Sequence, residues 1–128
     1  MEPRLQSFLF CDAVVPLPEE KIACYGIFTG IRLSSFPGTI PHFSILTSWT
    51  GGEGFHRLQM KIMNPKKSLI ISSSPETYFT LPAPETTAHV EIKVNQILFP
   101  EPGNYVFRLI LNDEEKEDII LPILKQEE

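Results

Sequence analysis

The sequence predicts an all-β protein, namely an antiparallel β-sandwich of seven to nine strands. Two observations favour this fold class. Twelve prolines in 128 residues separate short apolar runs, and proline is poorly tolerated inside helices. In residues 105–111 the apolar side chains fall on every second position behind a Pro-Gly turn, which is typical of a half-buried strand. We expect a single β-sandwich domain over residues 1–128, because a chain of this length supports one hydrophobic core.

The first pair of strands is expected on either side of residues 16–19, Pro-Leu-Pro-Glu. Folding the chain about this turn places Cys11 opposite Cys24. Both faces of these strands are apolar, so the pattern determines the register only weakly. We interpret residues 22–33 as a central strand with distortions at its two glycines, since glycine inside a strand often marks a bulge or a bend.

A second hairpin is expected to turn at the glycine-rich residues 51–54. Folding about this turn pairs Ile45 with Met60 and gathers apolar side chains on one face, while polar side chains share the other. The remaining pairs in this register are Phe43 with Ile62 and Thr47 with Leu58. The matching faces indicate two neighbouring strands of one sheet.

Three further strands are expected at residues 67–72, 78–81 and 87–98. The last of them either pairs with residues 105–111 in a hairpin or crosses to the opposite sheet. We favour the crossover because Tyr105 follows a Pro-Gly turn, where immunoglobulin-like domains place a tyrosine whose hydroxyl bonds back to the connecting backbone. The predicted sandwich is therefore immunoglobulin-like. Both cysteines precede Trp49, so the Cys-Trp-Cys order of antibody domains is absent.

The last hairpin is expected to turn at residues 113–115. Its register pairs Tyr105 with Ile123, Phe107 with Leu121 and Leu109 with Ile119. The opposite face carries Ile110 and Ile120 among charged residues. Because apolar area exposed to water favours association, we expect this face to meet a protein partner or a second copy of the chain. A cover from within the chain, such as residues 68–81, is the other possibility.

Four segments of the chain occur in a familiar order. They are LFCDAVV (residues 9–15), CYGIFTGI (24–31), SFP (35–37) and FPEPGNYVF (99–107). Together they resemble a family of small, functionally uncharacterised bacterial proteins with an immunoglobulin-like β-sandwich. In that family a strand ending in an acidic residue precedes a Gly-Ile-Phe strand and a Phe-Pro loop. The resemblance implies the fold and carries no activity and no functional residue.

Charge and hydropathy argue against several partner classes. The net charge is −5 and the eleven basic residues are scattered, whereas nucleic-acid binding needs clustered lysine and arginine. No run approaches the roughly 20 apolar residues of a membrane span, and residues 1–7 lack the order of a secretory signal. We expect a soluble cytoplasmic protein in which Cys11 and Cys24 are free thiols. The acidic run 113–118 is expected to be a solvated hairpin tip.

No catalytic, cofactor-binding or metal-ligating residue is predicted, and no binding residue is assigned. The histidines are His42, His56 and His89. The second hairpin places His56 by Trp49 and His42 at its far end, so these two side chains do not share an ion. The candidate nucleophiles lack both a Gly-x-Ser-x-Gly elbow and a neighbouring base or cation. They are Ser34, Ser35, Ser72, Ser73, Ser74 and Cys11, with Asp12 as the candidate acid.

Trp49, Tyr78 and Phe79 are candidates for an aromatic platform that binds sugar. Trp49 shares the inward face with Ile45, however, so we favour a role in closing one end of the core. The sequence therefore predicts a non-catalytic protein-binding or assembly module without a cofactor. The alternative is a small-ligand or carbohydrate-binding domain centred on Trp49 and residues 51–54.

Overall fold

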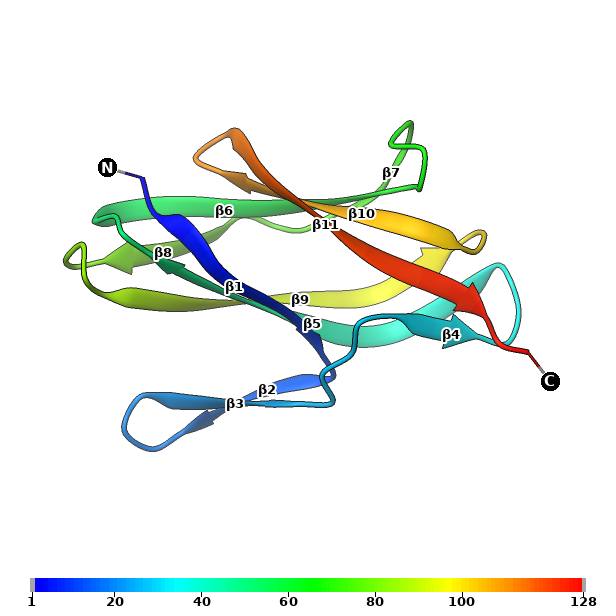
Figure 1. The fold of residues 1–128 in the computed structure, drawn as a ribbon, viewed down its shortest axis with the longest axis horizontal. Coiled ribbons are helices and arrows are strands. Elements are labelled where there is room, and N and C mark those ends of the chain that lie inside the picture. Colours follow the sequence, from blue (N-terminus) through cyan, green and yellow to red (C-terminus); the bar gives the residue numbers. More distant parts are fainter. Residues whose placement is uncertain (1, 128) are drawn as a thin grey trace.

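The computed structural model describes residues 2–127, which form eleven β-strands and no helix (Figure 1). The bounds are β1 (Arg4–Cys11), β2 (Ala13–Leu17), β3 (Lys21–Tyr25), β4 (Ile31–Leu33), β5 (Gly38–Thr50), β6 (Gly54–Met63), β7 (Ile70–Ser73), β8 (Thr77–Leu81), β9 (Thr87–Phe99), β10 (Gly103–Leu111) and β11 (Glu114–Lys125). The predicted all-β fold is confirmed. The structure has more strands than the predicted seven to nine, because the segment before residues 16–19 is divided into β1 and β2 and the segment after them into β3 and β4.

The strands form two large sheets and one small one. A three-stranded sheet has the order β1-β5-β9, and a six-stranded sheet has the order β4-β11-β10-β6-β7, with β8 also paired to β6. β2 and β3 form a separate two-stranded sheet, the β2–β3 arm, which extends at the bottom of Figure 1. The described pairs are antiparallel except β4 with β11.

The two larger sheets enclose one apolar core. Phe10 and Phe43 of the three-stranded sheet meet Phe107 of the six-stranded sheet, with ring centroids 5.1 and 6.3 Å from that of Phe107. Trp49 stacks on Phe79 elsewhere in the core, with centroids 6.0 Å apart. Every second side chain of the facing strands points into this core, as the period of two predicts.

The predicted hairpin between β5 and β6 is wrong. Ile45 of β5 pairs with Phe10 and Ile92, whereas Met60 of β6 pairs with Leu109. Both side chains are buried, but they enter the core from opposite sheets. Residues 51–53 therefore carry the chain from one sheet to the other.

The hairpin of β10 and β11 is confirmed, with a register two residues away from the predicted one. Phe107 pairs with Ile119 and Tyr105 with Leu121. The turn consists of Asn112 and Asp113, whose φ angles are 50° and 70°, as a type I′ turn requires. A shift of two residues leaves each side chain on its predicted face.

The β2–β3 hairpin exists, but its register also differs from the prediction. Val14 pairs with Cys24, and Cys11 belongs to β1, where it pairs with Ser44. The predicted central strand over residues 22–33 is wrong, because β3 ends at Tyr25 and β4 is a short edge strand. Gly26 breaks the strand: its φ is +66°, and a Cβ there would collide with the carboxylate of Asp12.

The crossover between β9 and β10 is confirmed, since these strands belong to different sheets. Tyr105 is fully buried, and its hydroxyl donates a hydrogen bond of 2.6 Å to the Glu101 carbonyl. Its ring meets Phe99 edge to face, with centroids 4.8 Å apart. The predicted tyrosine corner is therefore present.

Candidate functional site

The outer face of β6, β10 and β11 carries a row of apolar side chains that crosses four strands. Val106 pairs with Met63 on one side and with Ile120 on the other, and Met63 pairs with Ile70. Directly opposed residues in antiparallel strands share a face. We call Ile70, Met63, Val106 and Ile120 the apolar row. Its two inner members are buried, while Ile70 and Ile120 are 50% and 47% exposed.

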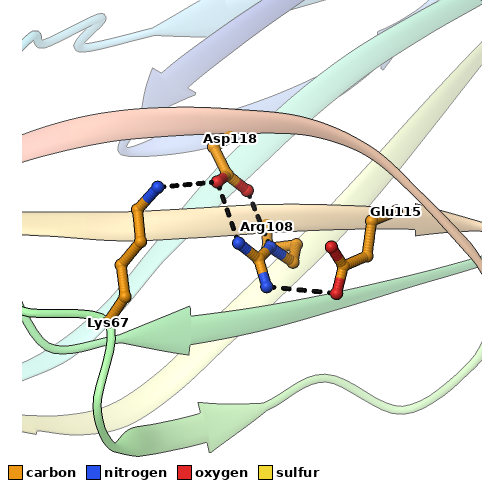
Figure 2. Close-up of polar contacts among 4 residues, drawn as sticks. All are labelled: Lys67, Arg108, Glu115 and Asp118. Carbon is orange, nitrogen blue, oxygen red and sulfur yellow. Dashed lines mark hydrogen bonds and ion pairs between the residues drawn. The ribbon is translucent and has the colours of Figure 1, made fainter.

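The connection between β6 and β7, residues 64–69, lies over part of this face. Lys67 extends to Asp118 of β11, with its Nζ 3.2 Å from Oδ2 (Figure 2), and Pro65 lies against Gly103. Asn64 holds the connection in shape, because its Oδ1 accepts the backbone N–H groups of Ser68 and Leu69. We call residues 64–69 the covering loop. An internal segment, the alternative to a partner in the sequence analysis, therefore lies over part of this face, but it is residues 64–69 and not 68–81.

A charged cluster consists of Lys67, Arg108, Glu115 and Asp118 (Figure 2). Arg108 pairs with Asp118 two residues along from the pair of Val106 and Ile120, so the cluster lies next to the apolar row. The guanidinium of Arg108 donates from Nε and Nη2 to the two carboxylate oxygens of Asp118, over 2.9 and 3.0 Å, and from Nη1 to Glu115 over 3.1 Å. The hydrogen bond from Arg108 lowers the pKa of Asp118 more than burial raises it, and Lys67 acts in the same direction. A planar guanidinium held in this way has a fixed orientation.

The structure separates the two isoleucines that the sequence singled out. Ile120 ends the apolar row, whereas Ile110 lies on the far side of Arg108, half-buried between Gln59 and Glu115. The sequence reasoning missed Ile70 and Lys67, because their place on this face depends on the path of the covering loop. The acidic run 113–118 is exposed at the hairpin tip, as predicted.

Each histidine has a separate environment. His56 is buried and pairs with Phe79, with ring centroids 5.4 Å apart and the rings tilted by 35°; the predicted pairing with Trp49 is wrong. Asn112 Oδ1 accepts the backbone N–H of Arg57, so the Asn112 amide group donates from Nδ2 to His56 Nδ1 over 3.1 Å. Because His56 Nδ1 is an acceptor, its proton is on Nε2, which donates to the Glu53 carbonyl over 3.1 Å. His89 lies 2.8 Å from the Ser48 hydroxyl. Within residues 2–127, no group of three His, Cys, Asp or Glu side chains could hold a metal ion.

The predicted role of Trp49 in the core is confirmed. The indole is buried, and its Nε1 donates to the Thr47 hydroxyl over 2.9 Å. Phe79 is buried beside it, whereas Tyr78 points outward and stacks on the exposed Phe55. The three rings therefore do not form a shared platform. The carbohydrate-binding alternative was centred on Trp49, which is buried and cannot contact a sugar from the surface.

The remaining candidates have structural environments. Cys11 is fully buried, and burial, followed by the neighbouring Cys24, raises the pKa of its thiol to about 11, which opposes nucleophilic reactivity. Both cysteines are free. The Ser74 hydroxyl accepts the backbone N–H of Met60 over 2.9 Å, so it completes the sheet. Ser34 and Ser35 lie in the bend that follows β4, and Asp12 lies against Gly26.

Comparison with known proteins identifies a family without an assigned activity. The model of DUF6941, a family of unknown function, matches residues 6–124. This match agrees with the expected membership in a functionally uncharacterised family. No curated protein matches the chain. Across the described part of the chain, no helix has the length and apolar character of a membrane span.

Proposed function

We propose that this chain, which belongs to DUF6941, a family of unknown function, is a non-catalytic protein-binding or assembly module. One observation carries the proposal: the apolar row is buried at its centre and about half exposed at Ile70 and Ile120. Exposed apolar side chains with a charged cluster beside them have the composition of an interface core and its polar rim. A second protein seated on this face would complete the burial of the row.

Hydrogen bonds hold the loop and the arginine of this face in place, and this supports the proposal. The covering loop is held by Asn64, and the Arg108 guanidinium is held by Asp118 and Glu115. A surface that is already ordered loses less conformational entropy when it binds. We assign Arg108 to positioning rather than to partner contact, because Asp118 and Glu115 already engage three of its nitrogen atoms.

The proposal extends to the fold type and the compartment. We propose an immunoglobulin-like sandwich, supported by the tyrosine corner at Tyr105 and by the crossover from β9 to β10. We also propose a bacterial origin, on the resemblance given above, and a cytoplasmic location. The free thiols of Cys11 and Cys24 are compatible with a reducing compartment.

Self-association is the form of binding that can be tested first. Sedimentation velocity of the wild type is expected to give an oligomer that Ile70→Lys and Ile120→Lys convert into folded monomers. Leu98→Lys is the matched control, because Leu98 is 51% exposed but belongs to the other large sheet. Circular dichroism checks that each variant is folded. A wild type that remains monomeric at every concentration, or a control that dissociates equally, contradicts assembly through this face.

A further inference from the structure

A groove lies where the β2–β3 arm joins the rest of the chain, on residues that the outer face does not include. Its volume is about 460 Å³, and it is lined among others by Asp12, Phe28, Ile31, Arg32, His42 and Phe43. Asp12 comes from the junction of β1 and β2, Arg32 from β4, and His42 from β5. Pockets for small ligands commonly have volumes of roughly 300–1,000 Å³ with apolar walls and a few polar groups.

Aromatic side chains form one part of the groove, and their neighbours hold them in place. Phe28 stacks on Phe10 with ring centroids 5.8 Å apart and meets Phe43 edge to face at 5.7 Å. The backbone fixes this arrangement, because the N–H of Phe28 donates to the Phe10 carbonyl over 3.0 Å. The N–H of Asp12 likewise donates to the carbonyls of Tyr25 and Gly26. The groove is therefore formed before any ligand binds.

Two opposite charges line the groove without pairing. Within residues 2–127, the ion pairs and the side-chain hydrogen bonds do not include the carboxylate of Asp12 or the guanidinium of Arg32. Elsewhere on the surface, charged side chains do pair, as Arg57 does with Asp113. Asp12 and Arg32 line the same groove as Phe28 and Phe43, so an unpaired carboxylate and an unpaired guanidinium are available there to the opposite charges of one ligand. A carboxylate ligand would fit the planar fork of an arginine.

We propose that this groove binds a small zwitterion with an apolar side chain, a free α-amino acid. The ligand ammonium binds Asp12, its carboxylate binds Arg32, and its side chain lies on Phe28 and Ile31. The proposal is independent of the outer face, because it uses different residues and a different partner.

Titration of the isotope-labelled wild type with L-leucine, followed by NMR chemical shifts, tests this proposal. We expect saturable shifts at the groove, and the same for L-phenylalanine. L-Leucinamide lacks the carboxylate and N-acetyl-L-leucine lacks the ammonium, so each should bind about tenfold more weakly or worse, the typical effect of one lost charged hydrogen bond. Absence of saturable shifts with both amino acids, or equal affinity for the two derivatives and L-leucine, overturns the proposal.

Two substitutions assign the charges to their residues. Arg32→Gln should weaken L-leucine binding about tenfold or more while leaving the weak binding of leucinamide unchanged. Asp12→Asn should likewise weaken L-leucine binding about tenfold or more while leaving the weak binding of N-acetyl-L-leucine unchanged. Lys21→Gln, at the exposed tip of the arm, is the control and should bind like the wild type. If Asp12→Asn does not fold, Arg32→Gln and the two leucine derivatives still test the proposal. An Arg32→Gln variant that binds L-leucine as tightly as the wild type contradicts the assignment of the ligand carboxylate to Arg32.

Discussion

Replacing Tyr105 with phenylalanine isolates the contribution of the tyrosine corner to stability. The hydroxyl donates to the Glu101 carbonyl over 2.6 Å and accepts the Glu101 N–H over 3.3 Å. A neutral hydrogen bond contributes about 0.5–1.5 kcal/mol net. Glu101 is exposed, so water can replace part of the loss. We therefore expect Tyr105→Phe to lower the free energy of unfolding by about 1–2 kcal/mol, while the ring keeps its contact with Phe99.

The effect should also depend on pH. Burial raises the pKa of Tyr105, so the folded state binds the phenolic proton more tightly than the unfolded state does. The corresponding stability is fully present below the ordinary tyrosine pKa of about 10 and is lost as pH rises above it through the folded value. The difference in free energy of unfolding between wild type and Tyr105→Phe should therefore shrink above about pH 10.

Urea unfolding at neutral and alkaline pH measures both effects. In a separate thermal unfolding experiment, a loss of 1–2 kcal/mol would lower Tm by roughly 3–10 °C for a chain of this size. Tyr25→Phe is the matched control, because Tyr25 is 56% exposed, and it should leave the urea midpoint unchanged. An unchanged midpoint for Tyr105→Phe, or an equal loss for Tyr25→Phe, would refute the tyrosine-corner reasoning.

Three further substitutions test other parts of the fold by urea unfolding. Asn112→Ala should cost about 2 kcal/mol, since it removes the hydrogen bonds to the Arg57 N–H and His56 Nδ1 and a residue suited to positive φ; a cost near zero contradicts this. Gly26→Ala should destabilise more than Gly54→Ala, because both glycines have positive φ but only Gly26 faces a carboxylate, that of Asp12; equal costs would mean that the contact with Asp12 is unimportant. Asp118→Asn should cost at most about 1 kcal/mol at neutral pH. Because Arg108 lowers the pKa of Asp118, this cost should begin to fall below about pH 4, the ordinary aspartate pKa, and vanish as pH falls through the lower pKa of the folded state. A cost that persists below that folded pKa would exclude the ion pair as its source.

Local signals predicted the all-β fold and the tyrosine corner, because both depend on residues close together in the chain. The alternation in residues 105–111 has a period of two, so it determines which face each side chain occupies. The same period leaves a two-residue shift undetected, as in the hairpin of β10 and β11. The position of the turn at Asn112 and Asp113 decides that register, and the pair Asn-Asp is a weaker turn signal than Asn-Gly.

The candidate sites were less predictable, because they combine residues from distant segments. Alternation correctly placed Ile120 on an outer face, but a bulge between Leu109 and Ile110 and the intervening Arg108 separate the two isoleucines. Lys67 reaches this face through the covering loop. The groove beside Asp12 depends on the positive φ of Gly26 and on the placement of β4. No periodic pattern encodes any of these contacts.

The failed hairpin of β5 and β6 shows why matched apolar faces do not establish pairing. Two amphipathic strands joined by a short link bring their apolar faces together in a hairpin and also across a core, where sheets lie about 10 Å apart. The link between β5 and β6, residues 51–53, can span that distance. Pairing is decided by competition for strand edges: β1 and β9 occupy both edges of β5, while β10 occupies one edge of β6 and β7 with β8 the other. Since neither strand has a free edge, the chain passes between the sheets at residues 51–53. The positive φ of Gly51 in this link and of Gly54, the first residue of β6, permits the turn.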